Sequence, residues 1–129
     1  MAHKANSMRT PLGRVRGLGA AKSGLSHWWH QRLTAIAMIP LICWMIWLVF
    51  SLSGADYQQA VSLISHPVNA TIMMLFVGVG FWHAALGLQV VIEDYVSDET
   101  IRMVALIMVK MLAILLASLT LFSILKIAL

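Results

Sequence analysis

Three long stretches of this chain are almost free of charged side chains. The first follows Arg32, the second precedes Glu93, and the third follows Arg102 and is interrupted only by Lys110. About 20 apolar residues are enough to cross the ~30 Å hydrocarbon core of a bilayer. In lipid such a run must be helical, because every backbone amide needs a partner within the segment. We therefore expect three transmembrane helices, at about 30–53, 66–92 and 102–127.

The composition agrees with a membrane location. Hydrophobic residues make up 60% of the 129 positions and charged residues 11%, and the mean hydropathy is +0.86. A soluble domain of this size would need more polar surface to cover its core, so the excess apolar surface is expected to face lipid. The connections between the spans are short. We expect an all-α protein in which residues 1–25 form a cytoplasmic tail and residues 26–129 form an up-down-up, three-helix transmembrane anchor.

The basic residues are distributed unevenly along the chain. Six of the nine Lys and Arg residues precede the first acidic residue, Asp56. The second connection adds Arg102, the first connection has no basic residue, and the C-terminal end has Lys126. A basic segment can bind nucleic acid, but beside a long apolar run it more simply sets membrane orientation. We expect no nucleic-acid partner, a cytoplasmic N-terminus and a C-terminus on the opposite side.

One histidine, His83, is expected near the middle of the bilayer. It lies eleven residues before Asp94, which is roughly 16 Å along a helix. Gly80 and Gly87 flank it on the same helix face. A polar group at this depth is a candidate functional site, and the glycines would permit the close approach of a haem macrocycle bound through the imidazole. Helix packing with a hydrogen bond across the bundle, or proton relay, would also explain the pattern.

The other histidines are expected at different depths. His27 and His30 lie at the cytoplasmic edge, His66 lies at the outer edge, and His3 lies in the tail. A haem with two histidine ligands could therefore not be completed within this chain. If His83 binds haem iron, we expect the second axial ligand to come from another subunit.

Asp94 and Tyr95 end the second expected span. Eleven residues rotate a helix by about 1100°, close to three full turns, so Asp94 should lie above His83 on the same face. A tyrosine hydroxyl can donate a hydrogen bond to a quinone carbonyl, and a neighbouring carboxylate can support the site and pass protons. Interfacial anchoring is the alternative explanation for this pair.

Arg32 enters the first expected span at the same membrane level. Its guanidinium is suited to carboxylates, including haem propionates, and His27 or His30 could donate there too. The alternative is that these side chains extend to the headgroup region. Lys110 is expected to extend toward the cytoplasmic side or to pair within the bundle, and no role follows for it.

Several tracts resemble one known family. Residues 81–96 (FWHAALGLQVVIEDYV) resemble the hydrophobic membrane anchor subunit of succinate dehydrogenase, the D-type partner of the cytochrome b556 subunit. Residues 30–37 (HQRLTAIA) resemble the entrance to its first helix, and residues 9–19 (RTPLGRVRGLG) are similar to the alphaproteobacterial form. Length and the three-span topology also match, so the resemblance covers nearly the whole chain.

The resemblance implies a role for each matching residue. His83 matches the axial ligand of haem b, whose opposite ligand comes from the partner cytochrome b subunit. Tyr95 matches the tyrosine that hydrogen-bonds ubiquinone, and Asp94 matches its neighbouring carboxylate. Arg32 matches an arginine near the haem propionates, and a histidine shortly before it is also implied there. His27 and His30 both satisfy that last expectation.

The function implied is that of a subunit of succinate:quinone oxidoreductase in the bacterial inner membrane. Such a subunit docks the flavoprotein and iron–sulfur subunits on the cytoplasmic face and contributes to haem b and ubiquinone binding. The chain has no flavin or iron–sulfur motif, so no active site for succinate is expected in it. The alternatives are the anchor of a quinol:fumarate reductase, or a cofactor-free structural subunit of another respiratory membrane complex.

Overall fold

The computed structural model of the protein describes residues 10–16 and 24–129, and within them the chain is helical without strands. The helices are α1 (Pro11–Arg16), α2 (Gly24–Leu52), α3 (Tyr57–Ser65), α4 (Pro67–Tyr95) and α5 (Glu99–Ala128). Of these, α2, α4 and α5 are 29, 29 and 30 residues long and apolar enough to cross a membrane. The predicted all-α, three-span membrane fold is thus confirmed. Most of the predicted tail, residues 1–9 and 17–23, lies outside the described residues.

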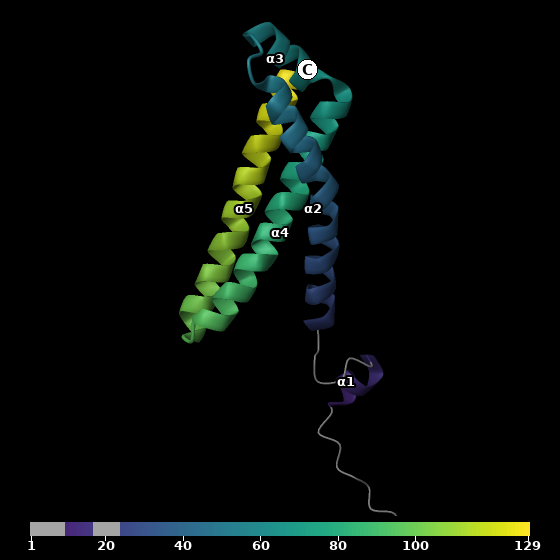
Figure 1. Ribbon diagram of the computed structural model, residues 1–129. Helices are drawn as coiled ribbons and strands as arrows, with labels where there is room; N and C mark the ends of the chain where they lie inside the picture. Colours follow the sequence, from purple (N-terminus) through teal and green to yellow (C-terminus); the bar gives the residue numbers. More distant parts are fainter. Residues whose placement is uncertain (1–9, 17–23) are drawn as a thin grey trace, which may run out of the picture.

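The three long helices alternate in direction (Figure 1). Helix α4 packs along both α2 and α5, and the short helix α3 contacts α4 and α5. The start of α2 and the α4–α5 connection lie at one end of the molecule, while α3 and the C-terminus lie at the other (Figure 1). This is the predicted up-down-up topology.

Each long helix extends three to six residues beyond its predicted span at the end that carries the α4–α5 connection, whereas α2 ends one residue earlier and α4 begins one residue later than predicted. Helix α5 begins at Glu99 because Asp98 caps it, accepting a 2.8 Å hydrogen bond from the backbone N–H of Ile101. Pro67 is the first residue of α4, where its missing N–H leaves no helix bond unmade. Helix α2 begins at Gly24 and continues through Pro40 as one unbroken helix. The boundaries differ because polar residues at a helix end are compatible with helical backbone outside the hydrocarbon.

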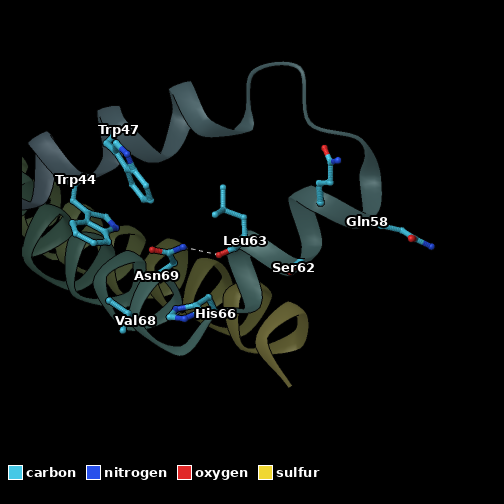
Figure 2. Close-up of a pocket in the computed structure, with 9 residues that line it drawn as sticks. Trp44, Trp47, Gln58, Ser62, Leu63, His66, Val68 and Asn69 are labelled. Carbon is cyan, nitrogen blue, oxygen red and sulfur yellow. Dashed lines mark hydrogen bonds between the residues drawn. The ribbon is translucent and has the colours of Figure 1, made fainter.

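Helix α3 occupies a segment that the hydrophobic pattern assigned to a connection. Gly54, with a φ of 85°, reverses the chain after α2. Asp56 and Gln59 then form a capping box, in which each side chain accepts from the other's backbone N–H at 2.8 and 3.2 Å. The buried Asn69 of α4 donates from Nδ2 to the carbonyl oxygen of Leu63 at 2.7 Å (Figure 2). This bond ties α3 to the start of α4.

The buried core lies at the end of the molecule that carries α3. Among the described residues, its buried apolar side chains are Leu48 of α2, Ala70 of α4 and Ile124 of α5. Toward the opposite end α2 and α4 diverge (Figure 1). Most large apolar side chains of the three long helices are exposed, so lipid or other membrane subunits must cover them. Helices α2 and α4 thus lie close together near α3 and separate toward the start of α2 (Figure 1).

Candidate functional site: the histidine cavity between α2 and α4

His83 is held by a hydrogen bond between two transmembrane helices. Its Nδ1 lies 2.9 Å from the hydroxyl oxygen of Thr34 on α2. The same hydroxyl lies 2.8 Å from the carbonyl oxygen of His30 and 3.1 Å from that of Gln31. Because carbonyl oxygens can only accept, the hydroxyl donates to one of them and can accept the Nδ1 proton of His83. Within the described residues the structure shows no hydrogen bond to Nε2, which stays available to a ligand.

The two glycines that flank His83 face α2. A β-carbon at Gly80 would lie 3.8 Å from Met38 Cε, and one at Gly87 would lie 3.6 Å from Gln31 Nε2. These are ordinary contact distances, so both glycine positions lie in the α2–α4 contact and each has room for a methyl group. Their location agrees with helix packing, one of the explanations that the sequence left open, and it leaves Nε2 of His83 free of a hydrogen bond within the described residues.

The half-buried ring of His83 lines an open-sided cavity of about 420 Å³ between α2 and α4. The other lining residues are Gly24, His27, Trp28, Gln31, Arg32, Ala35 and Val90. The cavity thus brings together three of the residues singled out in the sequence, His83, His27 and Arg32, although 56 positions separate His27 from His83. It lies toward the diverging end of the two helices.

Two polar atoms of this cavity's lining residues are buried without a hydrogen-bond partner. They are Nε2 of His27 and Oε1 of Gln31. Buried polar atoms in proteins are nearly always hydrogen-bonded, so each such atom needs an explanation. Both atoms lie beside the same cavity, where a water, a ligand or another chain would complete their hydrogen bonding. Gln31 Oε1 can only accept a hydrogen bond, whereas His27 Nε2 can donate or accept one according to the tautomer of the ring.

Arg32 and His30 both lie near the start of α2, but only Arg32 lines the cavity. The Arg32 guanidinium carbon lies 5.6 Å from the centre of the Trp28 ring, a cation–π distance. His30 is exposed and its Nδ1 donates to the carbonyl oxygen of Ser26 in its own helix, at 2.7 Å. His30 does not line the cavity. Between the two histidines that the sequence could not separate, the geometry favours His27 as the residue near a cavity ligand.

Asp94 and Tyr95 lie in the last turn of α4, and both are exposed, Tyr95 by 85%. Neither lines the cavity of His83. The unbroken helix from Pro67 to Tyr95 preserves the eleven-residue spacing that puts Asp94 and His83 on one face. The exposed Tyr95 side chain is thus accessible to other molecules at the end of α4.

Lys110 lies on α5, away from the histidine cavity. It is exposed and lines a groove of about 400 Å³ between α4 and α5, which Gln89 also lines. Gln89 Nε2 donates to Glu93 Oε1 at 2.8 Å. In the described part of the chain no three His, Cys, Asp or Glu side chains gather into a metal site. A metal held by His83 would therefore need further ligands from another molecule.

A larger cavity, of about 830 Å³, lies at the opposite end of the molecule and was not anticipated from the sequence (Figure 2). Its walls come from α2, α3, the start of α4 and the residue between α3 and α4; they include Trp44, Trp47, Ser62 and His66. The Trp44 and Trp47 rings lie 5.1 Å apart, and Trp44 Nε1 is buried without a partner. None of the sequence-predicted site residues lines it. In the sequence, only the pair Trp44 and Trp47, three positions apart in the first span, could have indicated this cavity.

Comparison with known proteins gives a consistent family. The family model of the succinate dehydrogenase/fumarate reductase transmembrane subunit matches residues 6–121. A succinate dehydrogenase hydrophobic membrane anchor subunit of Rickettsia bellii is 34% identical over 107 residues, 83% of this chain and 86% of the relative. A succinate dehydrogenase membrane anchor subunit of Reclinomonas americana is 31% identical over 96 residues, 72% of this chain and 80% of the relative.

A third relative, the hydrophobic membrane anchor subunit of Paracoccus denitrificans succinate dehydrogenase, is 32% identical over 91 residues, 70% of each chain. No solved structure matches the chain significantly. The resemblance inferred from residues 81–96 and 30–37 is confirmed. With a family model that spans most of its length, this multi-pass membrane protein belongs to the succinate dehydrogenase/fumarate reductase transmembrane subunit family.

Proposed function

We propose that this chain is the hydrophobic membrane anchor subunit of a succinate:quinone oxidoreductase in a bacterial inner membrane. The relatives are named succinate dehydrogenase membrane anchor subunits, and the three spans provide the membrane attachment. The observation that carries the finer proposal is the cavity that unites His83, His27 and Arg32 beside two unpartnered polar atoms.

The residues present fit one side of a haem b. His83 has Nε2 available for the iron, and Arg32 supplies a permanent positive charge for a propionate. His27 Nε2, buried and unpartnered, can donate to the same carboxylate. Bound haem would supply one-electron transfer within the membrane. The work of this chain is to hold the imidazole, neutralise propionate charge and exclude lipid from one face.

The proposed partner subunits would supply a further haem ligand and the oxidation of succinate. Haem iron held by His83 would need a further protein ligand, and the cytochrome b membrane subunit would supply it from the open side of the cavity. The flavoprotein and iron–sulfur subunits would supply the oxidation of succinate and deliver electrons to the membrane. The exposed apolar faces of α2, α4 and α5 fit both a membrane partner and lipid.

Ubiquinone would bind near the end of α4. Tyr95 presents its hydroxyl there as a hydrogen-bond donor to a quinone carbonyl, and Asp94 supplies a carboxylate beside it. This end of the molecule also carries the start of α2 (Figure 1). The positive-inside rule assigns that end to the cytoplasm, the side from which the soluble subunits would deliver electrons. The C-terminus would then be periplasmic.

Two other functions have some support. The family model covers the anchors of fumarate reductases as well, and the direction of the reaction depends on quinone potential and partners. A cofactor-free structural subunit is the second, because the Thr34–His83 bond and the glycine contacts also serve helix packing. The unpartnered atoms of His27 and Gln31 favour a bound group over this alternative.

The test is purification of the tagged chain from its native membranes under mild detergent. We expect a flavoprotein, an iron–sulfur protein and a second membrane subunit to co-purify, with a b-type haem in the reduced-minus-oxidised spectrum. Succinate should reduce an added quinone in this preparation. Purification with other respiratory subunits and no b-type haem would overturn the proposal in favour of the structural role.

A further inference from the structure

We propose that Thr34 is the residue that positions His83 for the haem, by fixing its ring orientation and the nitrogen that carries the proton. This inference rests on the proposed haem site. It concerns a residue of α2 to which neither the resemblance nor the family match assigns a role.

The first step is the direction of the hydrogen bonds. Thr34 has one hydroxyl proton, and two carbonyl oxygens of its own helix, those of His30 and Gln31, lie 2.8 and 3.1 Å from the hydroxyl oxygen. A threonine within a helix commonly donates to a carbonyl three or four residues earlier. With its proton used in that way, the hydroxyl meets His83 Nδ1 at 2.9 Å through a lone pair. His83 therefore carries its proton on Nδ1 and keeps the lone pair of Nε2.

The second step is the effect on a metal ligand. Histidines that bind metals usually donate their other ring N–H to an oxygen, which sets the tautomer, fixes the ring and raises ligand basicity. Thr34 supplies that oxygen from a neighbouring helix, and its own proton is anchored to the α2 backbone. A more basic imidazole stabilises oxidised iron more than reduced iron. Removing the acceptor should therefore raise the haem midpoint potential.

The close packing of the helices makes this arrangement specific to Thr34. Met38 and Gln31, which lie four residues after and three before it, contact the glycine positions at Gly80 and Gly87. Thr34 is thus the middle member of a contact line along α2, and it meets His83 between the two glycine positions of α4. At the resulting separation of α2 and α4 the short threonine side chain reaches the imidazole ring.

The experiment compares four versions of the assembled complex: the unsubstituted protein, Thr34→Val, Thr34→Ser and Thr120→Val. Thr34→Val removes the hydroxyl at nearly constant volume, and Thr34→Ser keeps it. Thr120→Val is the matched control, because Thr120 also donates to a carbonyl of its own helix, that of Leu116 at 2.8 Å, but lies on α5. The measurements are the haem midpoint potential by redox titration and the low-spin ferric signal by electron paramagnetic resonance.

We expect Thr34→Val to raise the midpoint potential and to shift the low-spin signal, while Thr34→Ser and Thr120→Val match the unsubstituted complex. Haem loss in Thr34→Val, with haem retained in Thr34→Ser and Thr120→Val, would support the same role. A midpoint potential and signal in Thr34→Val equal to those of Thr120→Val would overturn it. His83→Ala, measured in parallel, separates the two proposals: an unaltered haem there refutes ligation itself, whereas an altered haem there with an unaltered Thr34→Val refutes only the positioning role.

Discussion

Gly87 of α4 lies against the side-chain amide of Gln31 on α2, with 3.6 Å between Gln31 Nε2 and the point that a β-carbon would occupy. This spacing accommodates a methyl group and little more. Gly87→Ala should therefore assemble normally, whereas Gly87→Leu should push α2 from α4 and disturb the Thr34–His83 bond one turn away. We expect a several-fold loss of haem per complex in Gly87→Leu alone, measured by the pyridine haemochrome. Equal haem in the two variants would contradict this packing role.

His27 and His30 differ in their surroundings, although the sequence treats them alike. His27 lines the cavity with a buried, unpartnered Nε2, while His30 is exposed and bonded to the Ser26 carbonyl. We expect His27→Ala to weaken haem retention on salt and detergent washing, because a propionate partner is removed. His30→Ala should retain haem as the unsubstituted complex does. The reverse order of haem loss would show that His30 is the propionate neighbour.

Tyr95 offers the chain's proposed contact with ubiquinone. Tyr95→Phe removes the hydroxyl alone and should lower succinate:quinone reductase activity by about 10-fold, the equivalent of about 1.4 kcal/mol, within the range of a lost hydrogen bond. Succinate oxidation by a soluble dye and the haem content should not change. Tyr57→Phe is the matched control, because Tyr57 is also exposed but starts α3 at the other end. Equal quinone reduction by both variants would exclude the Tyr95 hydroxyl from the site.

Asn69 holds α3 against the start of α4 through its 2.7 Å bond to the Leu63 carbonyl. Asn69→Leu has a similar volume but cannot donate, and it leaves that carbonyl without its partner at a cost of about 1–3 kcal/mol. We expect a lower thermal unfolding temperature of the purified complex and faster proteolysis within residues 53–66. Gln58→Ala is the control, because Gln58 is an exposed residue of α3 that lines the 830 Å³ cavity together with Asn69. This substitution should change neither quantity. Unaltered stability in Asn69→Leu would show that the partner subunits, and not this bond, hold α3.

Much of the fold could be predicted from the sequence, because a bilayer leaves a long apolar segment few alternatives to a helix. The helix ends could not, because they depend on caps such as Asp98 and not on hydropathy. Helix α3 was missed since it has nine residues and lies on the bundle's end. The Asp56-to-Gln59 spacing of a capping box was the local signal that could have indicated it.

The site was predicted in part. Spacing within one helix identified His83 and its glycines, but no pattern within one helix shows which residue of another helix will contact them. The Thr34–His83 bond joins positions 49 residues apart. The choice between His27 and His30 likewise depended on the rotation of α2 about its axis, which tertiary packing sets. The proposed quinone site at Tyr95 would take its other walls from partner subunits, and a pattern within one chain cannot predict those contacts.

The most direct test of the haem site is the redox difference spectrum of the purified complex carrying His83→Ala, with His66→Ala as the control at the opposite end of α4. We predict that His83→Ala loses the low-spin b-type haem or shifts its midpoint potential strongly, because one axial nitrogen is removed, while His66→Ala retains both properties. A full complement of haem with an unchanged midpoint potential in His83→Ala would contradict the account.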